Sequence, residues 1–427
     1  MPTPSAATAP PPPCPIDVLD PRFYDDPWDA YRWLRDHSPV HWDAANELWV
    51  ISRHEDVSHI SRHPERYSAA DGVRPRVAAP MSNISMDDPE HTRQRRIVSR
   101  GFTPSRVRAL TDHIRDLSNE IIDEVAQRGQ LDFVEDFAIH VPLIVIAELM
   151  GLDPSQRDRL YAWSDAMMAG DSAVDPDDPR LHAAAEAFGE YAAMCTSLIE
   201  ERRAAPGARD DMISALTQAF DEGALTRADR GGAALDAEEL PNGDLTDDEL
   251  LMFLVLIVVA GNETTRNALT GGLMAFTQFP DQKQRVIDDP SLWETAVDEV
   301  IRFVSPVMSF SRTVTEAHTY QGVDLAAGDR VFLLYQSANR DERVFDAPDE
   351  LRVDRSPNPH LAFGIGTHYC MGANLARAEV RVVFEELFRR LGDIRVPDGT
   401  PLQRGDSSLV LSLSHLPAVF TPEASPR

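Results

Sequence analysis

With 427 residues, of which 43% are hydrophobic and 26% charged, the chain can bury a large core and has the composition of a globular enzyme. Its 41 lysines and arginines against 70 aspartates and glutamates give a net charge of −29, which argues against a nucleic acid as the main partner. The three cysteines, Cys14, Cys195 and Cys370, are too few and too scattered for a disulfide framework or a thiolate zinc site.

The N-terminal segment, residues 1–15, is rich in proline and alanine and has neither a basic region nor an apolar region of a signal peptide. We expect it to be a disordered tail. The longest apolar run, residues 250–261, is too short to span a membrane. Since no repeat or long spacer divides the rest, we predict a single catalytic domain over residues 16–427 in a cytoplasmic protein without a membrane anchor.

The predicted elements begin with a helix over residues 26–38 and two short strands, residues 39–43 and 48–52, which a turn joins as a hairpin. From about residue 90 to residue 300 the hydrophobic pattern is helical almost throughout. Further short strands are predicted within residues 318–335 and 407–416. The expected fold class is therefore mainly α with small β-sheets, an α+β arrangement.

One long helix is predicted to begin after a polar, glycine-rich loop at residues 221–245. Thr246 and Glu249 form a capping box, and Pro280 marks the end of a helix of roughly 30 residues. Because it is hydrophobic on nearly all sides, it should lie inside the protein. Its middle reads "AGNETT", residues 260–265, where polar Glu263 and Thr264 enter the interior and require a compensating role.

The segment "FGIGTHYCMG", residues 363–372, ends immediately before another predicted helix. Cys370 thus lies at or just before a helix N-terminus, where backbone N–H groups and the helix dipole favour a thiolate. Cys14 lies in the proline-rich tail, and Cys195 lies in a helical run without flanking glycines. The alternative for Cys370 is a buried, inert cysteine.

The spacing of Phe363, Gly366, Cys370 and Gly372 resembles the haem-binding loop of the cytochrome P450 family, Phe-x-x-Gly-x-x-x-Cys-x-Gly. The resemblance extends over about residues 17–420 and implies the cytochrome P450 fold, with the long central helix over haem b. It implies that Cys370 is the axial iron ligand, whose thiolate supplies the electron push for O–O cleavage. The other haem-binding residues that it implies are His91, Arg95, Arg312, Phe363, Gly364, His368 and Gly372.

Two charged pairs acquire a role only through this resemblance. Glu299 and Arg302 would meet Arg355 in a buried structural network, on a helix that we expect a capping box at residues 291–294 to open. Considered alone, the pair indicates a solvated helix face. His91 and Arg95 share one helix face and would bind the haem propionates, whereas without the resemblance they indicate an exposed basic helix.

The implied reaction is hydroxylation of a hydrophobic small molecule with O₂ and two electrons. Glu263 as the acid and Thr264 as the alcohol would deliver protons to bound oxygen, although a mid-helix threonine often only bonds the backbone. A peroxide-driven peroxygenase is disfavoured because such enzymes usually lack this acid and alcohol pair. A non-enzymatic haem sensor or lipid-binding protein remains an alternative.

The substrate is suggested by three phrases, residues 72–76, 260–272 and 337–345, which resemble actinobacterial members that oxidise sterol side chains and methyl-branched lipids. We therefore expect a sterol side chain or a branched lipid; the alternatives are another terpenoid, a polyketide or a fatty acid. The residues expected to line the substrate pocket are Leu256, Val259, Ala260, Val307, Met308, Leu409 and Val410.

The electron donor is expected to be a ferredoxin supplied by a ferredoxin reductase. Arg93, Arg96 and Arg100 form a basic cluster in an otherwise acidic chain. Such a cluster would steer a small acidic protein to this surface, so we predict that the ferredoxin docks there.

Overall fold

The computed structural model describes residues 12–13, 15–75, 81–102, 104–169, 177–221, 246–405 and 407–423. Most of this chain is helical, and none of the helices in these ranges is long and apolar enough to cross a bilayer. The α-helices are α1 (Trp28–His37), α2 (His54–Arg62), α3 (Glu90–Val98), α4 (Pro104–Val125), α5 (His140–Met150), α6 (Arg157–Ala169), α7 (Pro179–Ala204), α8 (Met212–Asp221), α9 (Asp247–Gln278), α10 (Pro280–Asp288), α11 (Trp293–Val304), α12 (Tyr335–Ala338) and α13 (Ala373–Arg390).

The strands form one sheet of five strands and two small sheets of two strands each. The five-stranded sheet has the order β1-β2-β8-β5-β3, in which only β2 and β8 run parallel, and β4–β9 and β6–β7 are antiparallel pairs. The strands are β1 (Val40–Asp43), β2 (Leu48–Ile51), β3 (Tyr67–Ser68), β4 (Gln130–Asp132), β5 (Ser309–Val314), β6 (His318–Tyr320), β7 (Val323–Leu325), β8 (Arg330–Leu334) and β9 (Pro417–Val419).

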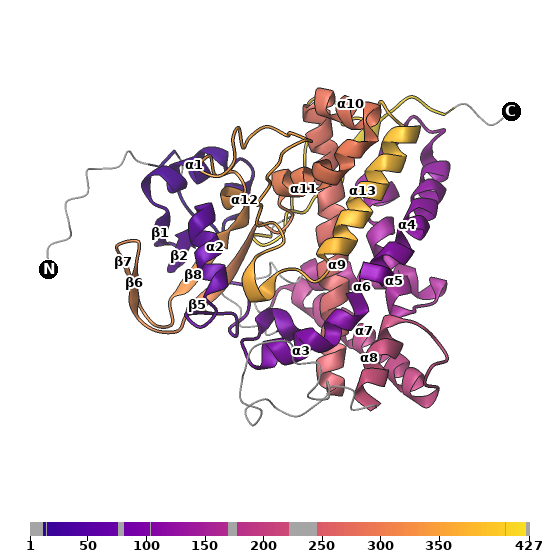
Figure 1. Ribbon diagram of the computed structural model, residues 1–427, viewed down its shortest axis with the longest axis horizontal. Helices are drawn as coiled ribbons and strands as arrows, with labels where there is room; N and C mark the ends of the chain where they lie inside the picture. The colour runs from indigo at the N-terminus through magenta and orange to yellow at the C-terminus, as the bar shows by residue number, and fades with distance from the viewer. Residues whose placement is uncertain are drawn as a thin grey trace.

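The molecule has a sheet-containing part with α1, α2 and α12, and a larger helical part through which α9 runs (Figure 1). The predicted hairpin is confirmed, since β1 pairs with β2 from Val40 opposite Ile51 to Asp43 opposite Leu48. The mainly α fold with small sheets that the sequence predicts is thus the observed one.

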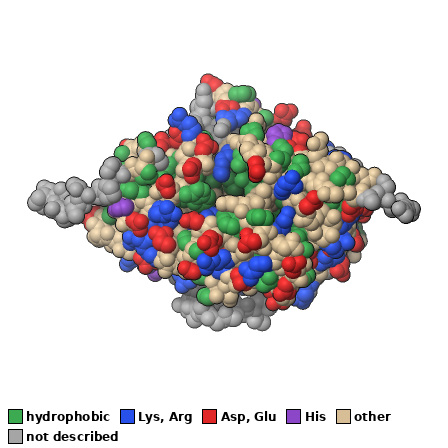
Figure 2. Space-filling model, turned by 90° about the horizontal axis from the view of Figure 1, so that it is seen from above, with side chains coloured by type: hydrophobic (Ala, Val, Ile, Leu, Met, Phe, Trp, Pro, Cys, Tyr) green, Lys and Arg blue, Asp and Glu red, His purple; other side chains and the backbone are tan. Residues whose placement is uncertain are grey.

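On the face shown in Figure 2, acidic and basic side chains are interspersed.

Helix α9 begins as the sequence predicts, because Thr246 Oγ1 accepts from Glu249 N at 3.2 Å and Glu249 Oε2 accepts from Thr246 N at 2.8 Å. Its first half packs in a core with α5, α6, α7 and α8, and its second half packs in a core with α4, α11 and α13. Residues 259–267 belong to neither core. The polar middle of the helix is therefore free to form the wall of a site.

Gly261 lies where α9 packs closely against α5. A Cβ atom at residue 261 would lie 2.5 Å from Ile146 Cδ1, closer than two carbon atoms approach without contact strain. A larger residue at position 261 would therefore require the Ile146 side chain to move.

Two predictions on local structure are wrong. Helix α11 has no side-chain cap at Leu292; instead Asp289 accepts from Ser291 N at 3.1 Å and caps the preceding turn, so the capping box at residues 291–294 does not form. Residues 407–416 contain only isolated bridges, and the last strand is β9. The described residues between 90 and 300 are helical almost throughout, as predicted, with β4 as a short strand among the helices.

Two further predictions lie outside the described residues. They concern residues 1–11 and Cys14 of the tail and residues 222–245 of the predicted loop.

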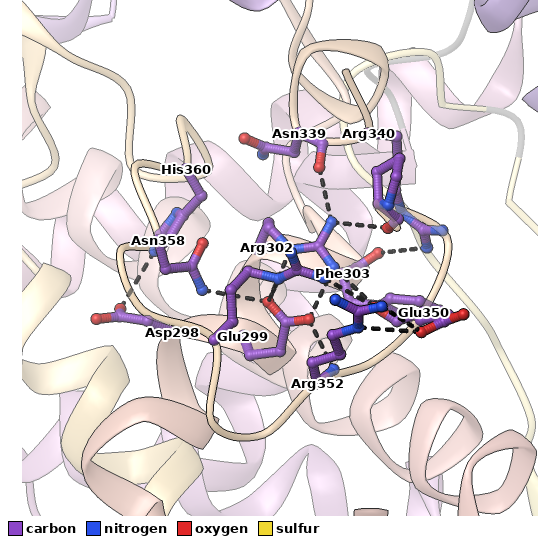
Figure 3. Close-up of polar contacts among 12 residues, drawn as sticks. Asp298, Glu299, Arg302, Phe303, Asn339, Arg340, Glu350, Arg352, Asn358 and His360 are labelled. Atoms are coloured by element: carbon purple, nitrogen blue, oxygen red, sulfur yellow. Dashed lines mark hydrogen bonds and ion pairs between the residues drawn. The ribbon is translucent and has the colours of Figure 1, made fainter. Parts of the chain in front are cut away.

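The predicted charge network is present and fully buried (Figure 3). Glu299 accepts from Arg302 through both carboxylate oxygens, at 2.7 and 2.8 Å, and from Arg355 Nε at 2.9 Å. The remaining donors of Arg302 reach the backbone carbonyls of Asn339, Pro348 and Glu350. Because these carbonyls lie on the loop after α12, the network ties that loop to α11.

Candidate active site

A cavity of about 310 Å³ lies between the middle of α9 and the loop that carries Cys370. It brings together every predicted site residue except one. The predicted residues that line it are His91, Arg95, Leu256, Val259, Ala260, Glu263, Thr264, Val307, Arg312, Phe363, Gly364, His368, Cys370, Gly372, Leu409 and Val410.

A second hollow, of about 510 Å³, lies away from these side chains and is lined mainly by polar and charged residues such as Asp281, Arg285 and Arg352. It contains none of the predicted site residues, and its exposed salt bridge between Arg285 and Asp354 is an ordinary surface feature. We therefore place the site in the apolar cavity beside Cys370.

Met308 is the exception and is a correction to the predicted pocket. Its side chain is 2% exposed and packs in the core between the sheet and α1, while its backbone N–H donates to Leu409 O at 2.7 Å. Side chains of neighbouring residues in an extended segment point to opposite sides. Val307 faces the cavity, so Met308 faces away from it.

The loop before α13 holds Cys370 through its backbone. Cys370 N donates to Phe363 O at 2.9 Å, which folds residues 363–370 into a compact turn. Gly366 has a φ of +78°, and a Cβ there would lie 2.6 Å from Ser61 O, so only glycine fits. The sequence prediction that Cys370 lies just before a helix N-terminus is confirmed, since α13 begins at Ala373 with Gly372 as its cap.

Opposing effects act on the Cys370 thiol, which is accessible from the cavity but deeply surrounded by protein. Burial raises its pKa, and this effect outweighs the backbone N–H groups of Gly372 and Ala373 and the charges of Arg95 and Arg377, which lower it. A bound cation would therefore be needed to complete the stabilisation of the thiolate. Cys195, in contrast, is buried inside α7, and burial raises its pKa to about 12.

Cationic and imidazole side chains gather on one wall of the cavity. Arg312 is 4% exposed, and the hydrogen bond recorded for its guanidinium group goes to the carbonyl of neighbouring Ser311 at 2.8 Å. The rings of His91 and His368 lie with centroids 4.3 Å apart, and His91 Nε2 is buried without a hydrogen-bond partner. Arg95 donates to Tyr369 O.

The electrostatics of this wall favour an anionic ligand. Burial, followed by the charges of Arg312, His91 and Arg95, lowers the pKa of His368 to about 2, so its ring is neutral. Burial also lowers the pKa of Arg312. Within the described ranges, neither Arg312 nor Arg95 forms a salt bridge with a carboxylate. Buried charges are normally paired, so this wall fits a ligand that brings carboxylates of its own.

Glu263 and Thr264 lie where the sequence predicts, on the cavity side of α9. Burial raises the pKa of Glu263, although Arg266 opposes the shift, and the carboxylate bonds Arg266 and Asn267, the latter at 3.2 Å. Thr264 Oγ1 donates to Ala260 O at 2.7 Å, the backbone bond that the sequence left open as an alternative. The threonine hydroxyl still has lone pairs with which to accept a hydrogen bond from the cavity side.

The predicted basic docking cluster is not a row of free cations. The Arg93 side chain is only 10% exposed and forms salt bridges with Glu90, at 2.8 Å, and with Glu249 at the start of α9. Arg96 is half-buried, and the side chain of Arg100 lies outside the described residues. Arg93 therefore joins α3 to α9, and its assignment to partner docking was wrong.

Sequence reasoning missed several cavity residues, of which Glu379 is the most unusual. It lies on α13, is 2% exposed, and accepts from Thr265 Oγ1 at 3.2 Å through one oxygen, while the other oxygen has no partner. Burial raises its pKa to about 8, so it is protonated at neutral pH. The sequence contains a signal for this residue, because Glu379 is a charged residue on the otherwise apolar face of the helix that follows Cys370.

Comparisons with known proteins agree with this geometry. The model of the family "Cytochrome P450" matches residues 290–415. A steroid C26-monooxygenase of Mycolicibacterium smegmatis is 36% identical over 411 residues, covering 96% of this chain and 97% of that protein. A methyl-branched lipid omega-hydroxylase of Mycobacterium bovis is 36% identical over 386 residues, covering 86% of this chain and 85% of that protein.

Solved structures are similar over nearly the whole chain. A Mycobacterium marinum cytochrome P450 in complex with pseudoionone has a TM-score of 0.81 at 32% identity and covers 97% of this chain and 100% of its own. The cytochrome P450 PksS of the Bacillus subtilis bacillaene polyketide synthase has a TM-score of 0.82 at 30% identity, and the match covers 95% of this chain and 100% of that chain.

Proposed function

Because the chain belongs to the cytochrome P450 family and is a haem-dependent monooxygenase, we propose that it hydroxylates the side chain of a sterol or a methyl-branched lipid. The observation that carries this proposal is the apolar part of the cavity lining, which includes Phe253, Leu256, Val259, Val307 and Val410. A long aliphatic chain buries its whole surface against such a wall at about 25 cal/mol per Å². The names of the similar proteins point to the same substrate class.

The residues present fit haem b. Cys370 would hold the iron, and Arg312, His91, Arg95 and His368 would receive the propionates, since neither arginine has a carboxylate partner among the described residues. When bound, haem b supplies the iron at which dioxygen is activated. The protein's own part is to exclude water with the apolar wall, to orient the substrate, and to supply protons.

We assign proton delivery to Glu263 and Thr264. Burial favours a carboxyl group at Glu263 that can hold a proton, and Arg266 beside it favours release, so this side chain is suited to proton exchange. Thr264 Oγ1 lies one residue on, at the cavity surface, and can accept a hydrogen bond there while it donates to Ala260 O. Water between the two groups would carry the proton.

We further propose that the two electrons come from a ferredoxin with its reductase, and that the ferredoxin docks over the loop before Cys370. Tyr369 in this loop is 38% exposed, which brings the surface within one residue of Cys370. The test is the rate of iron reduction under carbon monoxide by ferredoxin and ferredoxin reductase. Reduction by a flavodoxin but not by any ferredoxin would refute the choice of donor.

The substrate class is tested by titrating the holoenzyme with sterols, methyl-branched lipids, other terpenoids, straight-chain fatty acids and macrolactones. We expect a low-spin to high-spin shift of the Soret band with sterols or branched lipids, and a terminal hydroxyl on the extracted product. If only fatty acids or macrolactones shift the band, the proposed substrate class is wrong and one of the alternatives takes its place.

The proton assignment is tested with Thr264→Ala. We expect intact substrate binding but a fall in product formed per NAD(P)H, with the difference appearing as hydrogen peroxide. Thr270→Ala is the matched control, because Thr270 lies on the same helix, makes the same backbone bond, to Arg266 O at 2.7 Å, and does not line the cavity. Full coupling in Thr264→Ala would remove Thr264 from the proton path.

A further inference from the structure

Arg377 of α13 covers the loop that carries Cys370. Its guanidinium carbon lies 4.6 Å from the centre of the Phe363 ring, and its Nη1 lies 3.3 Å from Tyr369 Oη. Phe363 and Tyr369 are the residues that flank Cys370, since Cys370 follows Tyr369 and its N–H donates to Phe363 O. One side chain therefore contacts both ends of the turn that presents the sulfur.

Asp298 of α11 holds Arg377 from the other side. Arg377 Nε donates to Asp298 Oδ1 at 2.7 Å, and His360 Nε2 lies 3.2 Å from the same oxygen (Figure 3 shows the latter contact). His360 Nδ1 accepts from Ala362 N at 3.3 Å, so the proton of the ring is on Nε2 and points at Asp298. The carboxylate thus has two fixed donors.

These contacts keep Asp298 ionised although it is partly buried. Burial raises the pKa of Asp298, but the hydrogen bonds from His360 and Arg377 outweigh it, so the pKa lies below its usual range. The Asp298 and Arg377 side chains are 33% and 31% exposed, so water screens the pair only in part. The positive charge of Arg377 thus contacts the loop that carries Cys370, and the negative charge of Asp298 is bound to Arg377.

Arg377 differs from Arg95, the other guanidinium group whose field acts on Cys370. Arg95 lies in the cavity wall and has no recorded salt bridge to a carboxylate in the described chain, whereas Arg377 lies behind the loop and has Asp298 as its partner. The field that Arg377 exerts on the sulfur is therefore adjustable through a second residue. Removing Arg377 or Asp298 should act on the sulfur with opposite signs.

We infer that Arg377 is a positioning residue for Cys370, and that the Asp298–Arg377 pair sets the reduction potential of the iron that Cys370 holds. This inference rests on haem ligation by Cys370 and is independent of the substrate. A positive charge behind the thiolate withdraws electron density from the iron and favours its reduced form, which carries one positive charge fewer. Asp298 offsets part of this effect.

The test is the reduction potential of the substrate-free holoenzyme, measured by spectroelectrochemistry for Arg377→Gln, Arg377→Lys and Asp298→Asn. We expect Arg377→Gln to lower the equilibrium constant for reduction by about tenfold, which is about 59 mV for one electron. Asp298→Asn should raise it, and Arg377→Lys should keep most of the parent value because the charge remains.

Arg381→Gln is the control, because Arg381 lies one turn further along α13, pairs with Glu385 at 2.7 Å, and does not contact the loop. The reduction potential of Arg381→Gln should equal that of the parent protein. The ferrous carbonyl spectrum of each variant verifies that thiolate ligation is retained. Shifts of the same sign in Arg377→Gln and Asp298→Asn, or no shift in either, would overturn the inference. Asp298→Asn and Arg377→Lys decide the matter if Arg377→Gln does not fold.

Discussion

Two clusters of charged side chains, one around Glu299 and one on the cavity wall with Arg312, differ in how their hydrogen-bonding groups are satisfied. In the first, Glu299 accepts from Arg302 and Arg355, and all five N–H groups of Arg302 have protein acceptors. In the second, among the residues that the structure describes, Arg312 and Arg95 donate only to backbone carbonyls, and His91 Nε2 has no hydrogen-bond partner. Glu299, Arg302 and Arg312 are all buried, and Arg95 is half-buried, so Arg302 and Arg312 differ in pairing and not in burial.

The difference separates a structural role from a binding role. A buried ion pair whose donors are all satisfied holds loops together, and losing one member leaves an uncompensated charge. Buried cations without carboxylates weaken the fold unless a ligand supplies the anions. The first cluster should therefore govern stability, and the second should govern retention of the haem group.

The largest effect is expected from Glu299→Gln, which leaves Arg302 and Arg355 buried without a counter-charge. We expect the free energy of unfolding to fall by about 3–5 kcal/mol. Equilibrium denaturation of the holoenzyme in urea measures it, followed by tryptophan fluorescence. A loss below about 1 kcal/mol would mean that the first cluster is no more important to stability than a surface pair.

Arg312→Met should have a different signature, because it removes a buried cation from the wall that receives carboxylates. We expect haem to dissociate 10- to 100-fold faster, corresponding to the loss of one or two charge-assisted hydrogen bonds. Transfer of haem to an acceptor protein measures this rate. Arg330→Met is the control. Arg330 lies on β8, which pairs with the strand β5 that carries Arg312, donates to the carbonyls of Gly72 and Arg74, and does not line the cavity.

Stability of the apoprotein completes this test. Arg312→Met should leave it unchanged or raised, because an unpaired buried charge is lost. A fall of several kcal/mol would show instead that Arg312 belongs with the structural cluster.

Glu379, a buried carboxyl group outside both clusters, should make the stability of the protein depend on pH. Its pKa is raised from 4.5 to about 8, so between these values the folded protein binds one proton more than the unfolded chain. Stability from this group is present below pH 4.5 and decreases by about 1.4 kcal/mol per pH unit as the pH rises toward 8. Glu379→Gln should lack this decrease, so its stability relative to the parent should increase between pH 5 and pH 8. Parallel pH profiles would contradict the assigned protonation.

The smallest effect is expected from Arg285→Gln, which breaks the exposed pair with Asp354. Both side chains are about half exposed, so water screens the charges, and we expect a loss below about 1 kcal/mol. The same denaturation experiment serves here. A loss equal to that of Glu299→Gln would show that burial does not determine how much an ion pair contributes to stability.

Local sequence determines the elements whose signals lie within a few residues. The capping box of α9, the β1–β2 hairpin, and the turn that places Cys370 before α13 all depend on contacts between near neighbours, and each is predicted correctly. The polar interruption at Glu263 and Thr264 is visible because it contrasts with apolar residues around it. The family resemblance, rather than spacing, assigned chemistry to them.

Tertiary structure alone decides features whose partners are distant in the chain. Arg93 turns toward Glu249, 156 residues away, and so leaves the surface that its basic neighbours suggested. Met308 points into the core because strand β5 and residue 409 fix its side of the chain. Asp298 meets Arg377, and Glu379 loses water beside Thr265, only after α11, α13 and α9 pack. Charge and burial depend on three-dimensional neighbours, which residue order does not reveal.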